Sequence, residues 1–252
     1  MPVQVLKSKE EIYRSRAELD RRQISYLSGR KGLVRRVIEK LEKKLGIKKR
    51  EEKKELSVGN EIKSWDILLT IDFIEQRCSA DAAILDIGAS TSEIICSLHK
   101  AGFKNLTGID LDPKVMLMPF SDKIKYVIGD FMQTPFPDDS FDVVTAISVI
   151  EHGFNPDLLL KEMSRIIKRG GYFVGSTDYW PEKIDTKSQI YGMDWMIFSE
   201  KEIKEFIDIA KKYNFQIIGD KNFSAKEKPV EFLNQNYTFL WFAFQKTDDG
   251  EK

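Results

Sequence analysis

Three aspartates stand at comparable places in the sequence, each at or just after the end of a short apolar run. Asp86 lies in "ILDIGAS" two residues before Gly88, Asp110 ends "LTGID", and Asp130 ends "YVIGD". Asp110 follows Gly88 by 22 positions, a spacing at which a carboxylate can accept hydrogen bonds from both hydroxyls of a ribose. Any one of these acids could also be a surface or helix-capping residue. Their repetition at three strand ends favours a shared cleft.

The elements that must position these acids follow from alternating apolar and helical patterns. We predict strands at 83–87, 106–110, 124–128, 141–147, 172–176, 216–220 and 237–246. Helices are expected near 60–77, 92–101, 113–119 and 157–168, and a helix with a capping box of Ser199 and Glu202 at 199–215. The fold class is therefore α/β: a doubly wound, seven-stranded, mostly parallel sheet with an antiparallel last strand, helices on both faces and an N-terminal helical extension.

Charge divides the chain into two regions. Residues 1–64 hold 19 Lys and Arg against 10 Asp and Glu, whereas the rest of the chain holds 21 against 30. We expect a basic, helical extension over 1–58, including an amphipathic pattern at 32–47 and a charged run at 48–55. The extension either packs on the main domain or a second subunit, or contacts an anionic partner such as membrane phospholipid or nucleic acid. Residues 59–252 form the second domain.

The segments around the three aspartates resemble class I, Rossmann-like, S-adenosylmethionine-dependent methyltransferases of the type 11-like group. The resemblance covers about residues 60–246 and rests on "ILDIGAS", "LTGIDLD", "YVIGDFMQTPFPDDSFDVVTAISVIEH" and "LLLKEMSRIIKRGGYFVGST", in that order. It implies that S-adenosylmethionine is the cofactor. The implied cofactor-binding residues are Asp86, Gly88, Ala89 and Ser90 at the methionine part, Asp110 at the ribose, Leu111, Asp130 and Phe131 at the adenine, and Ile147 and Ser148 under the sulfonium.

The glycine loop departs from the G-x-G-x-G pattern of this family. Positions 88, 90 and 92 are Gly, Ser and Ser. The first glycine, at the tightest turn, is retained, and serine is small. The loss of the others argues against NAD, because a pyrophosphate needs close backbone approach. S-adenosylmethionine has no phosphate to hold.

The acceptor side is less determined. His152 follows the fourth strand and is either a general base or a residue that shapes its loop. Residues 177–200 form an insertion long enough to be a lid or binding wall. Its acids and aromatic side chains suit stacking on, and hydrogen bonding to, a sugar-like acceptor, although packing within the lid is an equal alternative. The candidate substrate residues are Asp178, Tyr179, Trp180, Tyr191 and Trp195.

We therefore expect an enzyme that methylates a small molecule or glycan, at a hydroxyl oxygen of a saccharide or related metabolite. A non-catalytic binding or scaffold protein and a lipid-linked acceptor remain open, as do peripheral membrane contact and a homo-oligomer. No base-flipping motif follows the fourth strand, so a nucleic-acid partner is not expected. The sequence contains two cysteines and no metal-ligand pattern. Without an apolar leader or membrane span, the expected location is the cytoplasm.

Overall fold

The computed structural model describes residues 3–27, 56–190 and 192–248. Five neighbouring strands of its central sheet run parallel, in the order β6-β5-β2-β3-β4. They are β2 (Ala83–Ile87), β3 (Asn105–Asp110), β4 (Lys125–Ile128), β5 (Phe141–Ile147) and β6 (Ile167–Tyr179). β6 begins earlier than predicted because the chain passes into it directly from the helix that ends at Ile166.

The other side of the sheet is built on a long antiparallel strand, β11 (Gln235–Lys246), which pairs with β6. β1 (Gln4–Val5), β9 (Phe215–Ile217) and β10 (Val230–Phe232) each pair antiparallel with β11. The prediction of an antiparallel last strand is confirmed. The predicted number of seven strands is wrong for the described residues, where the sheet has nine. The two additional strands, β1 and β10, are too short to show an alternating pattern.

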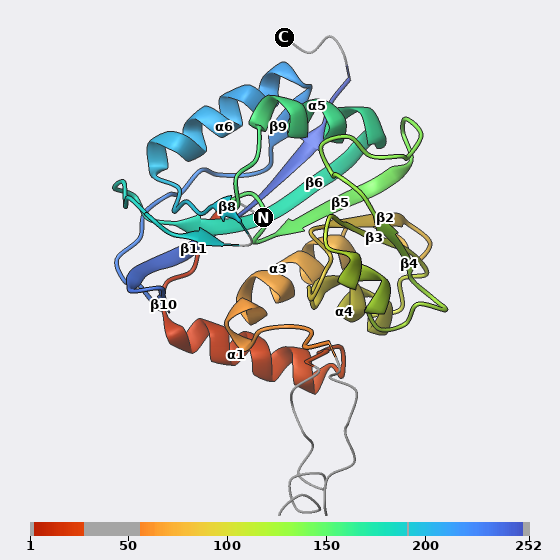
Figure 1. Ribbon diagram of the computed structural model, residues 1–252, viewed down its shortest axis with the longest axis horizontal. Coiled ribbons are helices and arrows are strands. Elements are labelled where there is room, and N and C mark those ends of the chain that lie inside the picture. Colours follow the sequence, from red (N-terminus) through yellow and green to blue (C-terminus); the bar gives the residue numbers. More distant parts are fainter. Residues whose placement is uncertain (1–2, 28–55, 191, 249–252) are drawn as a thin grey trace, which may run out of the picture.

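Helices cover both faces of the sheet, as predicted (Figure 1). α3 (Ser64–Glu75) and α4 (Ile94–Lys100) lie on one face, with α1 (Lys9–Arg21) packed outside α3. α5 (Pro156–Ile166) and α6 (Glu200–Lys212) lie on the other. Two short 3-10 helices, η1 (Glu61–Lys63) and η2 (Pro113–Leu117), precede α3 and follow β3. The α-helix expected at 113–119 is therefore a shorter 3-10 turn.

Each face of the sheet buries its own apolar core. On the α3 side, Trp241 is fully buried and its Nε1 donates a hydrogen bond of 2.9 Å to Thr70 Oγ1, which satisfies the one polar atom of the indole. On the α6 side, aromatic rings of β6, β11 and α6 pack edge to face, among them Phe173, Phe206 and Phe242. α6 begins with the predicted capping box at Ser199.

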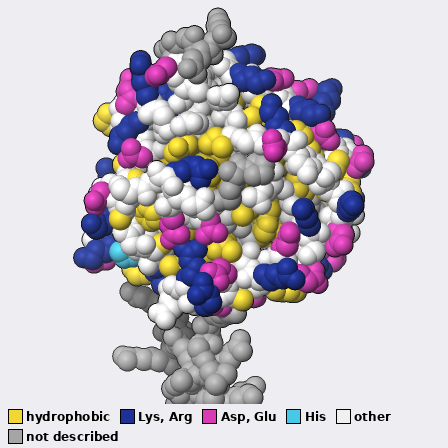
Figure 2. Space-filling model, turned by 180° about the vertical axis from the view of Figure 1, so that it is seen from behind, with side chains coloured by type: hydrophobic (Ala, Val, Ile, Leu, Met, Phe, Trp, Pro, Cys, Tyr) yellow, Lys and Arg dark blue, Asp and Glu magenta, His cyan; other side chains and the backbone are white. Residues whose placement is uncertain are grey.

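The described part of the N-terminal region is joined to the sheet. Besides the β1 pairing, Leu6 N donates to Phe239 O at 3.0 Å. The amphipathic pattern at 32–47 and the charged run at 48–55 lie outside the described residues. On the face shown in Figure 2, Lys and Arg side chains are interspersed with Asp and Glu. Within the described ranges, no helix combines the length and apolar character needed to cross a bilayer.

Candidate active site

The chain order of the strands reverses between β2 and β5, which makes their carboxyl ends the switch point of the sheet. Ligands of doubly wound sheets bind at this place. Cross-strand pairing sets Asp86 opposite Gly108 on β3 and Thr145 on β5. Asp110 closes β3 beside Ile128 of β4. The three predicted strand-end aspartates therefore lie at one edge of the sheet.

Asp86 is fully buried at this edge. Its Oδ1 accepts a hydrogen bond of 2.7 Å from Thr145 Oγ1, whereas Oδ2 makes no hydrogen bond within the described part of the chain. Burial raises the pKa of Asp86 to about 7, and the nearby charge of Asp110 adds to the rise. Such a carboxyl would be stabilised in its ionised form by an ammonium group. The amino group of the methionine part of S-adenosylmethionine fits this requirement.

Gly88 forms the turn after β2 in a conformation that favours glycine. Its φ is +69°, and a Cβ at this position would lie 2.6 Å from Val149 Cγ2. The N–H groups of Gly88 and Ala89 both donate to Ile109 O, at 3.0 and 3.2 Å. These two amides are thus used within the protein, and Gly88 serves the site through its turn.

Ser90 and Ser92 stand where the family pattern has glycines, and neither serine has a positive φ. Thr91, which lies between them, has a φ of +63°. Ser90 N donates to Asp110 Oδ2 at 2.8 Å, and its buried Oγ has no hydrogen-bond partner among the residues the structure describes. The loop therefore offers a second unsatisfied polar atom, Ser90 Oγ, close to Asp86 in sequence. Together they fit the polar groups of a methionine part.

Asp110 is held by two backbone amides. Its Oδ2 accepts from Ser90 N and its Oδ1 from Asp112 N, both at 2.8 Å. Each carboxylate oxygen has a second lone pair, so two ligand hydroxyls can still be bound side by side. This arrangement suits the vicinal hydroxyls of a ribose.

Asp130 lies next to Asp110, because Gly129 N donates to Asp110 O at 2.9 Å. Its Oδ1 is oriented by the backbone N–H two residues further on. Leu111 is 56% exposed beside these carboxylates, and Phe131 is partly buried. Apolar side chains around a polar acceptor suit a flat heterocycle that carries an amino group, such as adenine.

Lys63 reaches the end of β5 from η1, 85 positions away in the sequence. Ile147 ends the strand, and Ser148 follows with a φ of +55°. Lys63 Nζ donates to Ser148 Oγ and lies 3.5 Å from the centre of the Phe239 ring. It is also 3.7 Å from Asp178 Oδ1. This ammonium group joins the end of β5 to a cluster of side chains at the ends of β5 and β6, here called the polar wall, which consists of Glu151, His152, Asp178 and Trp195.

Asp178 and Glu151 form the acidic part of that wall. Asp178 Oδ2 accepts a hydrogen bond of 2.8 Å from Trp195 Nε1, and its side chain is 5% exposed. Glu151 is buried, and Thr177 Oγ1 donates to its Oε2 at 3.3 Å. Burial and then the charge of Asp178 raise the pKa of Glu151. Burial and the neighbouring Asp178 carboxyl therefore favour the protonated form of Glu151.

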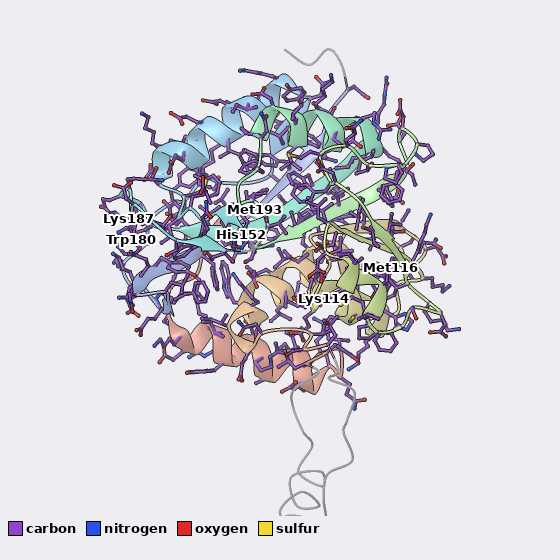
Figure 3. The ribbon with its side chains drawn as sticks, in the orientation of Figure 1. Lys114, Met116, His152, Trp180, Lys187 and Met193 are labelled. Atoms are coloured by element: carbon purple, nitrogen blue, oxygen red, sulfur yellow. The ribbon has the colours of Figure 1, made fainter. Side chains whose placement is uncertain are left out.

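His152 follows Glu151. A β-bridge with Trp195 joins it to residues 177–200, here called the lid segment. Burial lowers the pKa of His152, although the charge of Asp178 acts in the opposite direction. The imidazole is therefore neutral near pH 7 and can accept a proton. Figure 3 places His152 beside Met193 of the lid segment, with Lys114 and Met116 of η2 on the side of the molecule that carries β3 and β4.

The lid segment contains a short hairpin of β7 (Gln189–Ile190) and β8 (Met193–Asp194). Of the predicted acceptor residues, Asp178 and Tyr179 belong to the end of β6, and the set does not lie together. Asp178 and Trp195 contact each other, whereas Tyr179 is fully buried in the core of the opposite face, where its hydroxyl donates to Phe223 O at 2.7 Å. Trp180 is partly exposed at the outer end of the segment (Figure 3). Tyr191 lies outside the described residues.

Four site residues have no counterpart in the sequence prediction: Lys63, Asp66, Glu151 and Tyr237. Asp66 is buried on α3, accepts from Ser176 Oγ at 2.8 Å, and has its pKa raised to about 6 by burial. Burial and then the charge of Asp178 raise the pKa of Tyr237. Lys63 and Asp66 are three positions apart at the start of a helix, which places them on one face. That spacing was the only available signal, and it does not identify a partner.

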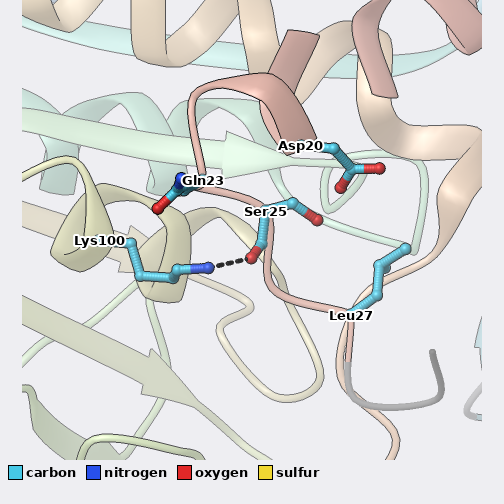
Figure 4. A pocket seen from close by; sticks show the side chains of 5 residues that line it. All are labelled: Asp20, Gln23, Ser25, Leu27 and Lys100. Atoms are coloured by element: carbon cyan, nitrogen blue, oxygen red, sulfur yellow. Dashed lines mark hydrogen bonds between the residues drawn. The ribbon is translucent and has the colours of Figure 1, made fainter. Parts of the chain in front are cut away.

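A shallow pocket elsewhere is lined by Asp20, Gln23, Ser25, Leu27 and Lys100 (Figure 4). Lys100 Nζ donates to Ser25 O across it. The pocket lies between the end of α1 and the end of α4, and none of the strand-end residues lines it.

Comparison with known proteins points to methyltransferases. Residues 85–175 match the family described as "Methyltransferase domain". A sterol 24-C-methyltransferase of Pneumocystis carinii is 26% identical over 162 residues, which are 58% of this chain and 43% of that protein. The chain thus spans less than half of this relative, and it spans 14% and 31% of two further sterol methyltransferases.

Two solved structures share the fold at low sequence identity. An S-adenosylmethionine-dependent methyltransferase of Methanosarcina mazei is 18% identical with a TM-score of 0.55, covering 69% of this chain and 97% of the other. The 1,6-didemethyltoxoflavin-N1-methyltransferase of Burkholderia thailandensis, solved with its substrate and S-adenosylhomocysteine, is 14% identical with a TM-score of 0.54, covering 73% and 79%. Residues 85–175 thus match a methyltransferase domain, and the chain shares the fold of class I, S-adenosylmethionine-dependent methyltransferases.

Proposed function

We propose that this protein transfers the methyl group of S-adenosylmethionine to an acceptor bound beside Lys63, Glu151 and His152. The observation that carries the proposal is that Asp86, Asp110 and Asp130 lie together where the parallel strands have their carboxyl ends. The polar wall at the ends of β5 and β6 is next to them. S-adenosylmethionine supplies a methyl carbon already activated by sulfur. The protein mainly has to hold the acceptor in line with that carbon.

The residues of this chain divide that task between them. Asp86 and Ser90 would hold the methionine part, and Asp110 the ribose hydroxyls. Asp130, with Leu111 and Phe131, would hold the adenine. Ile147 and Ser148 would lie below the sulfur. In the transfer, the bond between sulfur and the methyl carbon breaks as the acceptor atom bonds to that carbon, and the sulfur keeps the electron pair.

The acceptor atom we propose is a hydroxyl oxygen of a saccharide or related metabolite. Hydrogen-bonding groups gathered at the ends of β5 and β6 support this assignment: His152 is partly exposed there, and Glu151, Asp178 and Trp195 are buried around it. His152, whose lowered pKa keeps it neutral, would accept the proton that the hydroxyl loses.

A lipid acceptor is the second candidate, and two observations favour it. The relatives named above act on sterols by their names. In addition, large apolar side chains are exposed on and beside η2 and at the end of β4, namely Leu111, Met116, Leu117 and Ile128. With a lipid or lipid-linked acceptor, the basic region within residues 1–64 would contact the anionic membrane surface.

Titration calorimetry with S-adenosylhomocysteine is the first test, followed by transfer of a labelled methyl group to a panel of saccharides, sterols and vesicles that carry lipid-linked saccharides. Saturable binding and label on a saccharide oxygen are expected. Label on a sterol or only on vesicle lipid would select the second candidate. Tight binding without transfer to any acceptor in the panel would favour a non-catalytic binding protein. Absence of binding at high micromolar ligand would refute the methyltransferase assignment.

A further inference from the structure

Arg16 of α1 is a buried arginine with no place in the methyltransferase motifs. Its side chain is 2% exposed, and its guanidinium donates to both carboxylate oxygens of Glu93, each at 2.8 Å. It also donates to Ser64 Oγ at 2.9 Å and Ser25 Oγ at 2.6 Å. A bidentate pair with further hydrogen bonds fixes both partners in orientation as well as position. Arg16 therefore ties α1 to Glu93, the residue just before α4.

Glu93 directly follows the loop 88–92, and the loop contains an unfavourable backbone conformation. Thr91 has a φ of +63°. A β-branched residue rarely occupies this region and does so only where its surroundings hold it. Glycine would adopt it freely, but the chain has glycine only at position 88 of this loop.

Two backbone amides from the N-terminal region hold the loop, one at the strained Thr91 and one at Glu93. Gly59 N donates to Thr91 O at 2.9 Å, and Tyr26 N donates to Glu93 Oε1 at 2.8 Å. Gly59 itself leaves no room for a side chain, because a Cβ there would lie 2.5 Å from Leu27 Cδ2 and 3.1 Å from Glu93 Oε2. These residues come from outside 85–175, the part that matches the methyltransferase family.

The held loop includes the groups that face the donor. Ser90 lies one residue before Thr91, and its N–H donates to Asp110. Loss of the backbone conformation held at Thr91 and Glu93 would therefore move Ser90 and weaken the hydrogen bond from its N–H to Asp110.

We propose that Arg16 is a positioning residue for the methyl donor. Together with the backbone amides of Tyr26 and Gly59, Arg16 holds residues 88–93, which are the strained loop and the glutamate after it, in the shape that binds the donor. A glycine-rich loop would reach this shape without such support. The inference rests on the proposed function, since it concerns the donor site assigned there.

The test measures S-adenosylhomocysteine affinity by calorimetry on the full chain, together with urea unfolding. Arg16→Gln should weaken binding about tenfold or more. Thr91→Gly, which removes the strain, should change binding little by itself but restore most of the affinity lost in Arg16→Gln. A purely structural role of Arg16 would not give this rescue. Arg16→Lys keeps the charge without the bidentate geometry and replaces Arg16→Gln if that variant does not fold.

Arg22→Gln is the matched control. Arg22 also joins α1 to α3, through Asp72 at 2.7 Å and Glu75 at 2.6 Å, but does not contact the loop. It should reduce stability while leaving donor affinity unchanged. The inference is overturned if Arg16 variants bind like the unaltered protein, if Arg22→Gln weakens binding equally, or if Thr91→Gly gives no rescue. Failure of the unaltered protein to bind would instead refute the proposed function itself, and the inference with it.

Discussion

Asp86 provides a stability prediction that needs no ligand. Its pKa is raised from 3.8 to about 7 by burial in the folded protein. At pH values between 3.8 and about 7, Asp86 is therefore protonated in the folded state and ionised in the unfolded state. The contribution of Asp86 to the free energy of unfolding is fully present below the pKa that Asp86 has in the unfolded state, and it is lost as the pH rises through about 7. Between about pH 5 and about pH 8, the loss should amount to roughly 2–3 kcal/mol, at 1.36 kcal/mol per unit of pKa difference.

The perturbation that isolates this contribution is Asp86→Asn, which keeps the shape and leaves an oxygen to accept the hydrogen bond from Thr145. Other buried carboxyls, such as Asp66, titrate in both proteins and cancel in the comparison. Urea unfolding at several pH values should show the unaltered protein losing roughly 2–3 kcal/mol more than the variant between about pH 5 and about pH 8. Parallel pH profiles of the two proteins would show that Asp86 is ionised in the folded state, and the reasoning from burial would be wrong.

Three further outcomes are expected at the same site. Asp110→Asn should weaken S-adenosylhomocysteine binding by about 2–4 kcal/mol, since two hydrogen bonds to a charged acceptor are weakened; unchanged calorimetric affinity would remove Asp110 from the donor site. Gly88→Ala should lower the free energy of unfolding by about 1–3 kcal/mol, because the new Cβ meets Val149 at 2.6 Å. Gly102→Ala, with positive φ but open space around it, is its control and should cost less. His152→Gln should slow methyl transfer by about 100-fold or more without weakening donor binding; in the unaltered protein the rate should fall only in acid below the range in which an ordinary histidine titrates, because burial lowers the pKa of His152.

Much of the fold, and the placement of the strand-end aspartates, could be predicted from sequence because their signals are local. The strands that end near Asp86 and Asp110 are short apolar runs between helical patterns, and the order of the runs implies a parallel sheet. In such a sheet the carboxyl ends meet at one edge. The strand β1, with two residues, has no pattern to detect, and the helix expected at 113–119 became a 3-10 turn after the Asp112 cap.

The acceptor side was harder to predict because alternation along a strand decides which face each residue occupies. Asp178 and Tyr179 are neighbours, yet Asp178 contacts Trp195 in the site while Tyr179 is buried in the opposite core. A shift of one residue in the strand register would have exchanged them. The register is fixed by the pairing of β6 with β11, far along the chain.

The sequence by itself determined the class of fold, the three strand-end aspartates and the single glycine that the first turn requires. Each depends on residues close together in the chain, where periodicity and spacing carry the information. Only the tertiary structure decided that Lys63 meets Ser148 and Asp178, and that Arg16 meets Glu93, 77 positions away. Such pairs depend on how α1 packs on α3 and how α3 packs on the sheet. Burial in the folded protein also removes water from Asp86 and Glu151, and desolvation raises their proton affinities.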